Sequence, residues 1–272
     1  MTIAAGFVVR NGILLCADML FSDGETREYR EKIFPWFGKH ASICFAVSGP
    51  DVARVAVDHC RDALAAWEGE TLLTSDAMGI IRPIVKYMYD EFVDAKPCED
   101  RDRVRFRLMV GIAPASEVPT LYVTVDGAIA PVAEFDCIGS GRQLARYVIG
   151  RGYDKAMTVD QVAILAIQAL AATKEVVDGV GGRSQFIVVR DNKLSPVVAH
   201  DIDESEAFAL RYQERCAKLL LAAGDGEMAD ADFRHRLDVF TTQILQTRKD
   251  WLASASPWKE LLDQLRQESG GG

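Results

Sequence analysis

The chain has 272 residues, of which 49% are apolar, and a formal net charge of −9 at pH 7. A chain of this length and apolar content can bury a sizeable core, so we expect a globular protein. The negative charge argues against nucleic acid and anionic membrane surfaces as partners. No stretch is apolar and long enough to span a bilayer, and the beginning of the chain lacks the pattern of a secretory signal. We therefore expect a cytoplasmic protein that binds neither nucleic acid nor membrane.

The cysteines and histidines do not indicate a metal or disulfide site. The six cysteines are scattered singly at positions 16, 44, 60, 98, 137 and 216, without a CxxC pair. We interpret them as reduced thiols, which fits the cytoplasm. The four histidines, at positions 40, 59, 200 and 235, are well separated. We expect no metal and no cofactor.

The first part of the chain predicts a hairpin, a further strand and a pair of helices. Two apolar runs flank Asn11-Gly12, a dipeptide that favours a tight two-residue turn. A polar loop leads to Lys32, and a turn at Gly38-Lys39 precedes a half-buried strand at 41–48. Helices are expected at about 51–67 and 75–95, and we expect Pro83 to kink the second.

The second part repeats this order of strands, paired helices and strands. A charged loop at 96–103 precedes it, and Gly139-Ser140-Gly141 is expected to turn into a helix at 142–150. Thr158-Val-Asp-Gln161 is a capping-box pattern, so a long helix should run from Thr158 to about 177. The expected strands lie at 105–113, 121–125, 128–132, 135–138, 185–189 and 194–199, and the last two form a hairpin with a turn at 191–193.

This order favours an α+β fold in which two antiparallel sheets pack face to face with helices outside each, a four-layer αββα sandwich. We place this domain at residues 1–200 and a helical C-terminal extension at 201–272. The extension is helical at about 211–223 and 231–267, with a break at 224–226. Its apolar stripe comprises Phe233, Leu237, Phe240, Ile244, Leu245, Trp251, Trp258, Leu261, Leu262 and Leu265. Such a stripe needs a partner surface, on its own domain or on another subunit.

Thr2, Asp18 and Lys32 have a chemical use in common. A threonine hydroxyl is a weak nucleophile until a base takes its proton, and the base can be the residue's own α-amine, whose pKa is close to neutrality. A nearby lysine ammonium lowers the pKa of hydroxyl and amine, and a carboxylate can hold that lysine in place. This chemistry requires Thr2 to be the first residue, so Met1 must be removed, and threonine is small enough to allow its removal.

Thr2, the segment Asn-Gly-Ile-Leu-Leu-Cys-Ala-Asp18 and Lys32 together resemble the N-terminal-nucleophile (Ntn) hydrolases of the proteasome β-subunit type. The similarity is greatest to bacterial self-compartmentalising members and covers roughly residues 2–200. It implies the same αββα fold, with Thr2, Asp18 and Lys32 as catalytic residues. The spacing from Asp18 to Lys32 is about two residues shorter than in the family, which leaves Lys39 as the alternative equivalent of Lys32.

The resemblance implies four further site residues. The Gly49 N–H would stabilise the oxyanion, and Val47 would form the floor of an apolar substrate pocket. Ser140 would lie near the amine of the nucleophile, and Asp178 would orient that serine and the threonine. Three of them also have an ordinary explanation: Gly49 and Ser140 suit turns, and Asp178 suits the end of a helix.

The chain departs from the family at Gly181, where active members carry a second serine, so one hydroxyl near the amine is missing. The resemblance implies a threonine endopeptidase that cleaves polypeptides inside rings or stacked rings, with an ATP-dependent unfoldase or activator as partner. Gly181 and the long extension favour an alternative, a proteasome-like structural or assembly protein with little or no peptidase activity. A third hypothesis is an Ntn amidase that acts on a small amide.

Overall fold

A computed structural model of the chain describes residues 2–10, 12–22, 26–38, 40–190, 193–196 and 199–254. Its contacts divide the chain into two units, residues 1–207 and residues 208–272. The first unit contains two five-stranded antiparallel sheets. No helix among the described residues is long and apolar enough to cross a membrane.

The first five-stranded sheet contains the N-terminal hairpin. Its strands are, in spatial order, β10 (Phe135–Gly139), β1 (Ile3–Val9), β2 (Gly12–Asp18), β11 (Ser184–Arg190) and β12 (Lys193–Pro196). Val9 pairs with Gly12, so the predicted hairpin is confirmed, although Asn11 itself lies outside the described residues. β2 is central and fully buried, and Asp18 is its last residue.

The second five-stranded sheet contains β5 (Ile33–Phe37), β6 (Ala41–Ser48), β7 (Arg107–Pro114), β8 (Thr120–Val125) and β9 (Ala128–Val132), in this order. Pro35 and Pro131 lie in its edge strands β5 and β9. This placement is expected because proline cannot donate a ladder hydrogen bond. A small two-stranded sheet of β3 (Leu20–Ser22) and β4 (Arg27–Tyr29) lies between Asp18 and Lys32, where the sequence predicted a loop.

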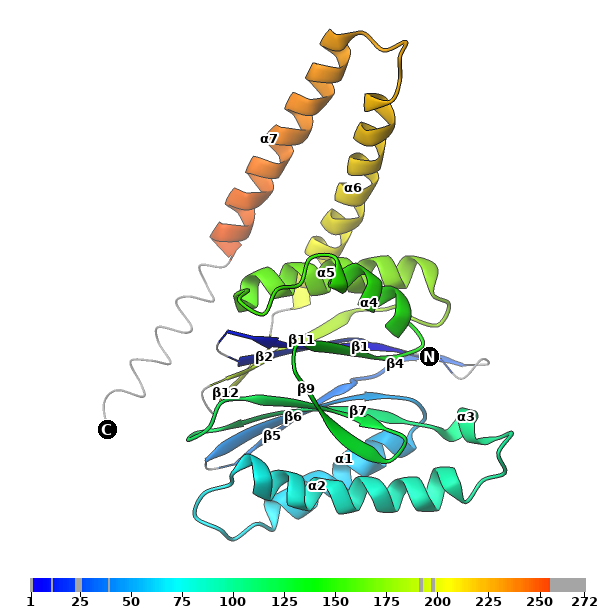
Figure 1. Cartoon of the computed structure of the whole chain (residues 1–272), viewed down its shortest axis with the longest axis vertical. Helices are drawn as coiled ribbons and strands as arrows, with labels where there is room; N and C mark the ends of the chain where they lie inside the picture. Colours follow the sequence, from blue (N-terminus) through cyan, green and yellow to red (C-terminus); the bar gives the residue numbers. More distant parts are fainter. Residues whose placement is uncertain are drawn as a thin grey trace. The chain divides into compact units, whose positions relative to one another are not determined.

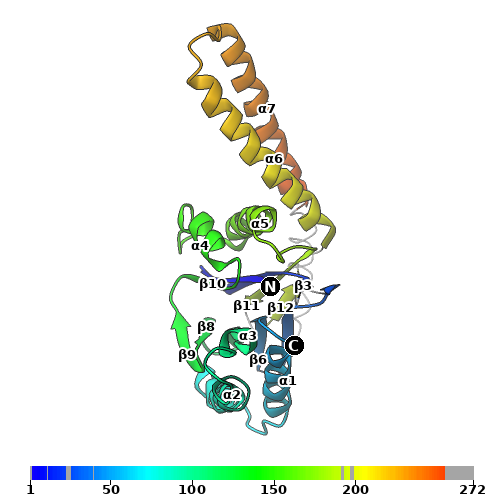
Figure 2. The same cartoon turned by 90° about the vertical axis from the view of Figure 1, so that its right-hand side faces the viewer.

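Helices cover the outer face of each sheet of the first unit, as the layers in Figures 1 and 2 show. Helices α4 (Arg142–Gly150) and α5 (Val159–Val176) cover the sheet of β1 and β2. Helices α1 (Val52–Ala65) and α2 (Thr74–Tyr89), the second extended by a π-helical turn η1 (Asp90–Asp94), cover the sheet of β6 and β7. The predicted α+β class and its four-layer arrangement are confirmed.

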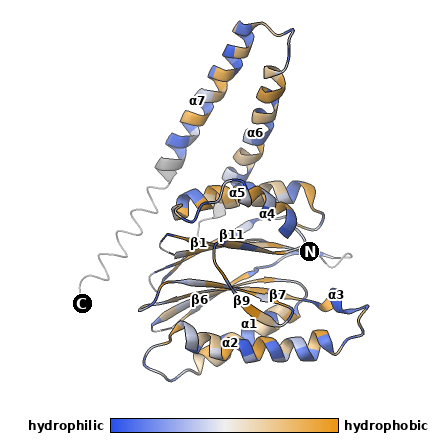
Figure 3. Ribbon diagram, in the orientation of Figure 1, coloured by the Kyte–Doolittle hydropathy of each residue, from blue (hydrophilic) through white to orange (hydrophobic). Residues whose placement is uncertain are grey.

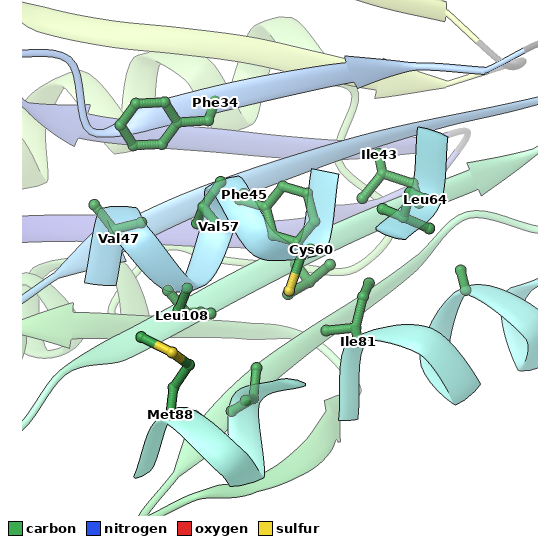
Figure 4. Packing of buried hydrophobic residues seen from close by; sticks show 14 of the residues in the cluster. Phe34, Ile43, Phe45, Val47, Val57, Cys60, Leu64, Ile81, Met88 and Leu108 are labelled. Carbon is green, nitrogen blue, oxygen red and sulfur yellow. The ribbon is translucent and has the colours of Figure 1, made fainter. Parts of the chain in front are cut away.

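Apolar side chains fill the spaces between these four layers, and two of the three interfaces contain large buried clusters. Between the sheets pack side chains such as Ile13, Leu15 and Met109. Between the second sheet and its helices pack Phe45, Val57, Ile81 and Leu108, among the residues drawn in Figure 4. Because β6 contributes to both layers and is buried along its whole length, its exit toward Gly49 is rigidly placed.

Local sequence patterns predicted some ends of helices and strands correctly, and others differ in the structure because of tertiary packing. The Thr158 hydroxyl accepts a hydrogen bond from the Gln161 N–H, as the capping box predicts. The strand predicted at 194–199 is wrong at its end, because helix α6 (Ala199–Ala223) already begins at Ala199. Ile202 and Ala209, seven residues apart on this helix, are both buried, and such packing overrides local strand preference. The predicted loop at 96–103 also contains the start of a short helix, α3 (Arg101–Val104).

The described part of the second unit contains α6 from Phe208 onward and helix α7 (Asp230–Ser254). Stacked rings join the two helices: the Tyr212 ring lies 6.2 Å from that of Phe208 and 5.5 Å from that of Phe240. Apolar residues are nevertheless exposed on both helices: Leu220, Leu221, Leu237, Val239 and Leu245. Figure 3 shows that hydrophobic and hydrophilic residues alternate along both helices. The Trp251 side chain and the predicted stripe residues Trp258, Leu261, Leu262 and Leu265 lie outside the described part.

Replacement of Phe45 by alanine should destabilise the first unit by about 3–5 kcal/mol, because the ring is fully buried and leaves a cavity. The measurement is the free energy of unfolding from denaturant titration. Phe37→Ala is the matched control, because Phe37 lies on the neighbouring strand but is 67% exposed, and its effect should stay within about 0.5 kcal/mol. Equal effects of the two substitutions would contradict the described core.

Candidate active site

The main chain of Thr2 is held by the turn that follows β10. The Thr2 N–H donates a hydrogen bond to the Ser140 hydroxyl at 3.2 Å, and that hydroxyl donates back to the Thr2 carbonyl at 3.3 Å. The Gly141 N–H also donates to this carbonyl, at 3.3 Å. A side chain at Gly139, which has a φ of +97°, would overlap the Thr2 carbonyl. The Gly-Ser-Gly sequence therefore fits a close approach of two backbones around Thr2.

The Asp18 carboxylate, at the end of β2, accepts hydrogen bonds from three donors. Its Oδ1 accepts hydrogen bonds from the Ile3 N–H at 2.9 Å and from the Lys32 ammonium at 2.7 Å. Its Oδ2 accepts one from the Gly181 N–H at 3.0 Å. The carboxylate has no exposed surface, and a buried charge of this kind is tolerated only when it is paired and hydrogen-bonded.

Lys32 lies between the two sheets and is almost as buried as Asp18, with 4% of its side chain exposed. Its ammonium also donates to the Leu20 carbonyl at 2.5 Å. Its main chain is held by the Gln185 side chain and by the Val47 N–H. Burial lowers the pKa of Lys32, and the neighbouring Asp18 carboxylate partly opposes this shift. Lys32 is thus fixed in position and gives up its proton more readily than a free lysine.

Thr2, Lys32 and Gly49 line one pocket. Thr2 is 4% exposed, and its hydroxyl forms no hydrogen bond with another described residue. Gly49 has a φ of +113°, and a side chain there would collide with the backbone of Arg105 and Phe106. Its N–H likewise has no acceptor among the described residues. Thr2 and Gly49 therefore line one space, and each has a polar group without a hydrogen-bond partner among the described residues.

The wall of this pocket is apolar and its rim is charged. Val47, Phe34 and Phe21 contribute the apolar surface. Arg30 stacks over the Phe21 ring at 4.9 Å and pairs with Asp51 at 3.0 Å across the rim. The pocket holds about 30 Å³, room for one or two water molecules.

The structure brings together six of the seven residues that the sequence singled out, and Asp178 is the exception. Asp178 is exposed after α5 and has no hydrogen bond to Thr2 or Ser140 within the described residues. Its proposed orienting role stays a prediction. Lys39, the alternative to Lys32, lies outside the described residues, whereas Lys32 occupies the position beside Asp18.

Sequence reasoning missed two features of this site. The first is the Gly181 N–H, which binds Asp18 through the backbone and so gives no sequence signal. The second is the pair Arg30 and Asp51 at the pocket rim, which depends on how the loop before β5 meets the start of α1. No group of three His, Cys, Asp or Glu side chains among the described residues could hold a metal ion, and all six cysteines are free.

A comparison with models of protein families shows to which family the chain belongs. The family model of the proteasome subunit matches residues 2–189. The chain belongs to the proteasome subunit family. Residues 190–272 lie beyond the match. The C-terminal helices α6 and α7 are therefore not part of the region that this chain shares with the family model.

Solved structures agree with this fold at low sequence identity. Anbu (ancestral beta-subunit) from Yersinia bercovieri is 12% identical, with a TM-score of 0.67 over 80% of this chain and 97% of that one. Anbu from Pseudomonas aeruginosa, solved as a helical assembly of the Anbu complex, is 15% identical, with a TM-score of 0.68 over 84% and 99%. Anbu from Hyphomicrobium sp. strain MC1 is 16% identical, with a TM-score of 0.64 over 84% and 99%. No curated protein matched the sequence.

Asp18→Asn should destabilise the chain by about 3–5 kcal/mol, because it leaves the buried Lys32 ammonium without its counter-charge. Denaturant unfolding measures the loss. Asp51→Asn removes a carboxylate from a solvent-exposed ion pair instead, and we expect its unfolding midpoint to stay close to that of the parent protein. A parent-like midpoint for Asp18→Asn would mean that Asp18 and Lys32 do not form a charged pair.

Proposed function

We propose that this proteasome-family chain is a threonine peptidase whose nucleophile is the Thr2 hydroxyl, once removal of Met1 has freed the Thr2 amine. The observation that carries the proposal is the common pocket, because Thr2, Lys32 and Gly49 line one space. These are a nucleophile, a fixed positive charge and an oxyanion donor.

The proposed reaction proceeds in two halves. The Thr2 Oγ attacks the scissile carbonyl while its proton passes to the Thr2 amine, and the Gly49 N–H binds the oxyanion that forms. The protonated amine then gives its proton to the leaving amine of the substrate, and an ester to Thr2 remains. Water, deprotonated by the same amine, attacks this ester and releases the acid, and the proton returns to Oγ.

Each remaining residue has a positioning role in this proposal. Lys32 lowers the pKa of the Thr2 hydroxyl and amine by its charge, and Asp18 holds Lys32. Ser140 orients the Thr2 nitrogen through the contact described above, and Asp178 would act through Ser140. Val47 and Phe34 favour apolar substrate side chains next to the cleaved bond.

We further propose that the chain works as part of a self-associated complex. A peptidase site that binds polypeptides needs enclosure, and the Pseudomonas aeruginosa Anbu complex forms a helical assembly. The exposed leucines of α6 and α7 are suited to contact other subunits. Rings or stacked rings, and an ATP-dependent unfoldase or activator, remain expectations of the family resemblance.

Two observations favour an alternative, a structural or assembly subunit without peptidase activity. Gly181 supplies no hydroxyl to the site, and Asp178 is exposed without a hydrogen bond to Ser140 in the described part of the chain. A chain that retained the fold but lost these two contacts would act as a structural or assembly subunit. This alternative predicts assembly without any reaction at Thr2.

A peptide epoxyketone separates these functions, because it closes a ring only with a residue that has both a free α-amine and a β-hydroxyl. We expect one adduct per chain on the peptide that begins with Thr2, loss of peptide cleavage when the adduct forms, and no adduct in Thr2→Ala. Assembled protein without an adduct or peptide cleavage would favour the structural alternative. Labelling without cleavage of long peptides would favour a small-amide amidase.

Gly181→Ser should increase the rate of this labelling by about fivefold, the value of one added hydrogen bond near the amine. A Cβ at position 181 would lie 3.3 Å from the Leu20 side chain, and the backbone there is not left-handed, so serine fits with a small shift. Gly79→Ser is the matched control, because a Cβ at position 79 meets no atom within 4 Å. A labelling rate unchanged from the parent would show that the missing hydroxyl does not limit the site.

A further inference from the structure

A second, largely buried ion pair lies on the α5 side of the β2–β11 pair. The ammonium of Lys174, in the last turn of α5, is 2.6 Å from Glu206 Oε2. The Ser184 hydroxyl donates to the other oxygen of the same carboxylate, also at 2.6 Å. The two charged side chains are only 13% and 12% exposed. Both carboxylate oxygens are therefore occupied in a site that is mostly shielded from water.

This pair is connected to the proposed catalytic residues through the first sheet. Ser184 is the first residue of β11, and its strand partner is Asp18. Gln185, the next residue, accepts a hydrogen bond from the Lys32 main chain. A displacement of Ser184 would therefore move the segment that supports Asp18 and Lys32 together.

The charge of Lys174 also affects Lys32. Burial is the main cause that lowers the pKa of Lys32, the Asp18 carboxylate raises it, and the positive charge of Lys174 lowers it further. The Cys16 thiol of β2, whose pKa is raised mainly by burial, is influenced by Glu206 and Lys174 in opposite directions. The other charged residues that line the same pocket as Lys32 are Arg30, Glu31, Asp51 and Arg54, and Arg30 is paired with Glu28 and Asp51. Glu206 is thus the negative charge that compensates Lys174.

We propose that Glu206 is a positioning residue of the threonine site: its carboxylate neutralises Lys174 and fixes Ser184 beside Asp18, which keeps the Lys32 ammonium charged and directed at Asp18. This inference rests on the proposed function of the site. Glu206 lies on α6, beyond the residues 2–189 that match the family model. A residue beyond the family match, at the end of the first unit, therefore contributes to the active-site electrostatics.

The test compares three variants of the full-length protein. Glu206→Gln keeps the size of the side chain and an acceptor for Ser184 but removes the charge, so Lys174 acts on Lys32 without compensation. Adding Lys174→Gln removes both charges and should reverse the effect. Asp90→Asn is the control, because Asp90 pairs with Lys86 in an exposed contact on α2 and η1, on the other sheet.

Two readouts are followed against pH: the titration of Lys32 in protein with ¹³Cε-labelled lysine, and the labelling rate of Thr2 by the epoxyketone. In Glu206→Gln we expect Lys32 to titrate at lower pH than in the parent. We expect labelling on the alkaline side to fall about threefold to tenfold, as for coupled residues in one network. In the double variant both should return to the parent values, and Asp90→Asn should change neither.

A Glu206→Gln variant that loses stability but keeps the parent titration of Lys32 would overturn the proposal, since Glu206 would then be only structural. A double variant that fails to restore the titration would also overturn it. If the parent protein shows no labelling at all, the proposed peptidase function fails, and the Lys32 titration alone still decides whether Glu206 acts on Lys32.

Discussion

The buried contact between Asp18 and Lys32 is the interaction on which the rest of the site depends. Asp18 ends β2 in one sheet and Lys32 precedes β5 in the other, so the ion pair joins the two sheets. The same carboxylate also fixes the Ile3 and Gly181 N–H groups. A buried charge without its partner costs several kcal/mol, and the chain must therefore bring these separate segments together to fold.

The charged residues near Thr2 form two ion pairs, one beside the pocket and one farther from it. Lys32 is compensated by Asp18, and Lys174, which acts on Lys32, is paired with Glu206 on α6. In the account proposed here, the net effect is a lysine that stays charged although burial favours its neutral form. The site then includes a residue of the first unit that lies beyond the part of the chain that matches the proteasome subunit family.

The sequence predicts those features that depend on neighbouring residues and fails where distant segments meet. The β1–β2 hairpin, the Thr158 capping box and the alternation of strands with helix pairs follow from local patterns, and they were enough for the fold class. Family resemblance predicted Thr2, Asp18, Lys32, Gly49 and Val47 around one site. The Arg30–Asp51 contact and the Glu206–Lys174 pair could not be predicted, because their partners meet only through tertiary packing. The strand expected to reach 199 was wrong for the same reason, since burial of Ile202 and Ala209 favours a helix there.

The intact mass of the protein, purified in its assembled form, tests the central claim most directly. The account predicts a mass that lacks Met1, so that the chain begins with a free Thr2 amine beside Ser140 and Lys32. A mass that retains Met1 on every chain would contradict it, because Thr2 would then have an amide nitrogen in place of the base that its hydroxyl needs.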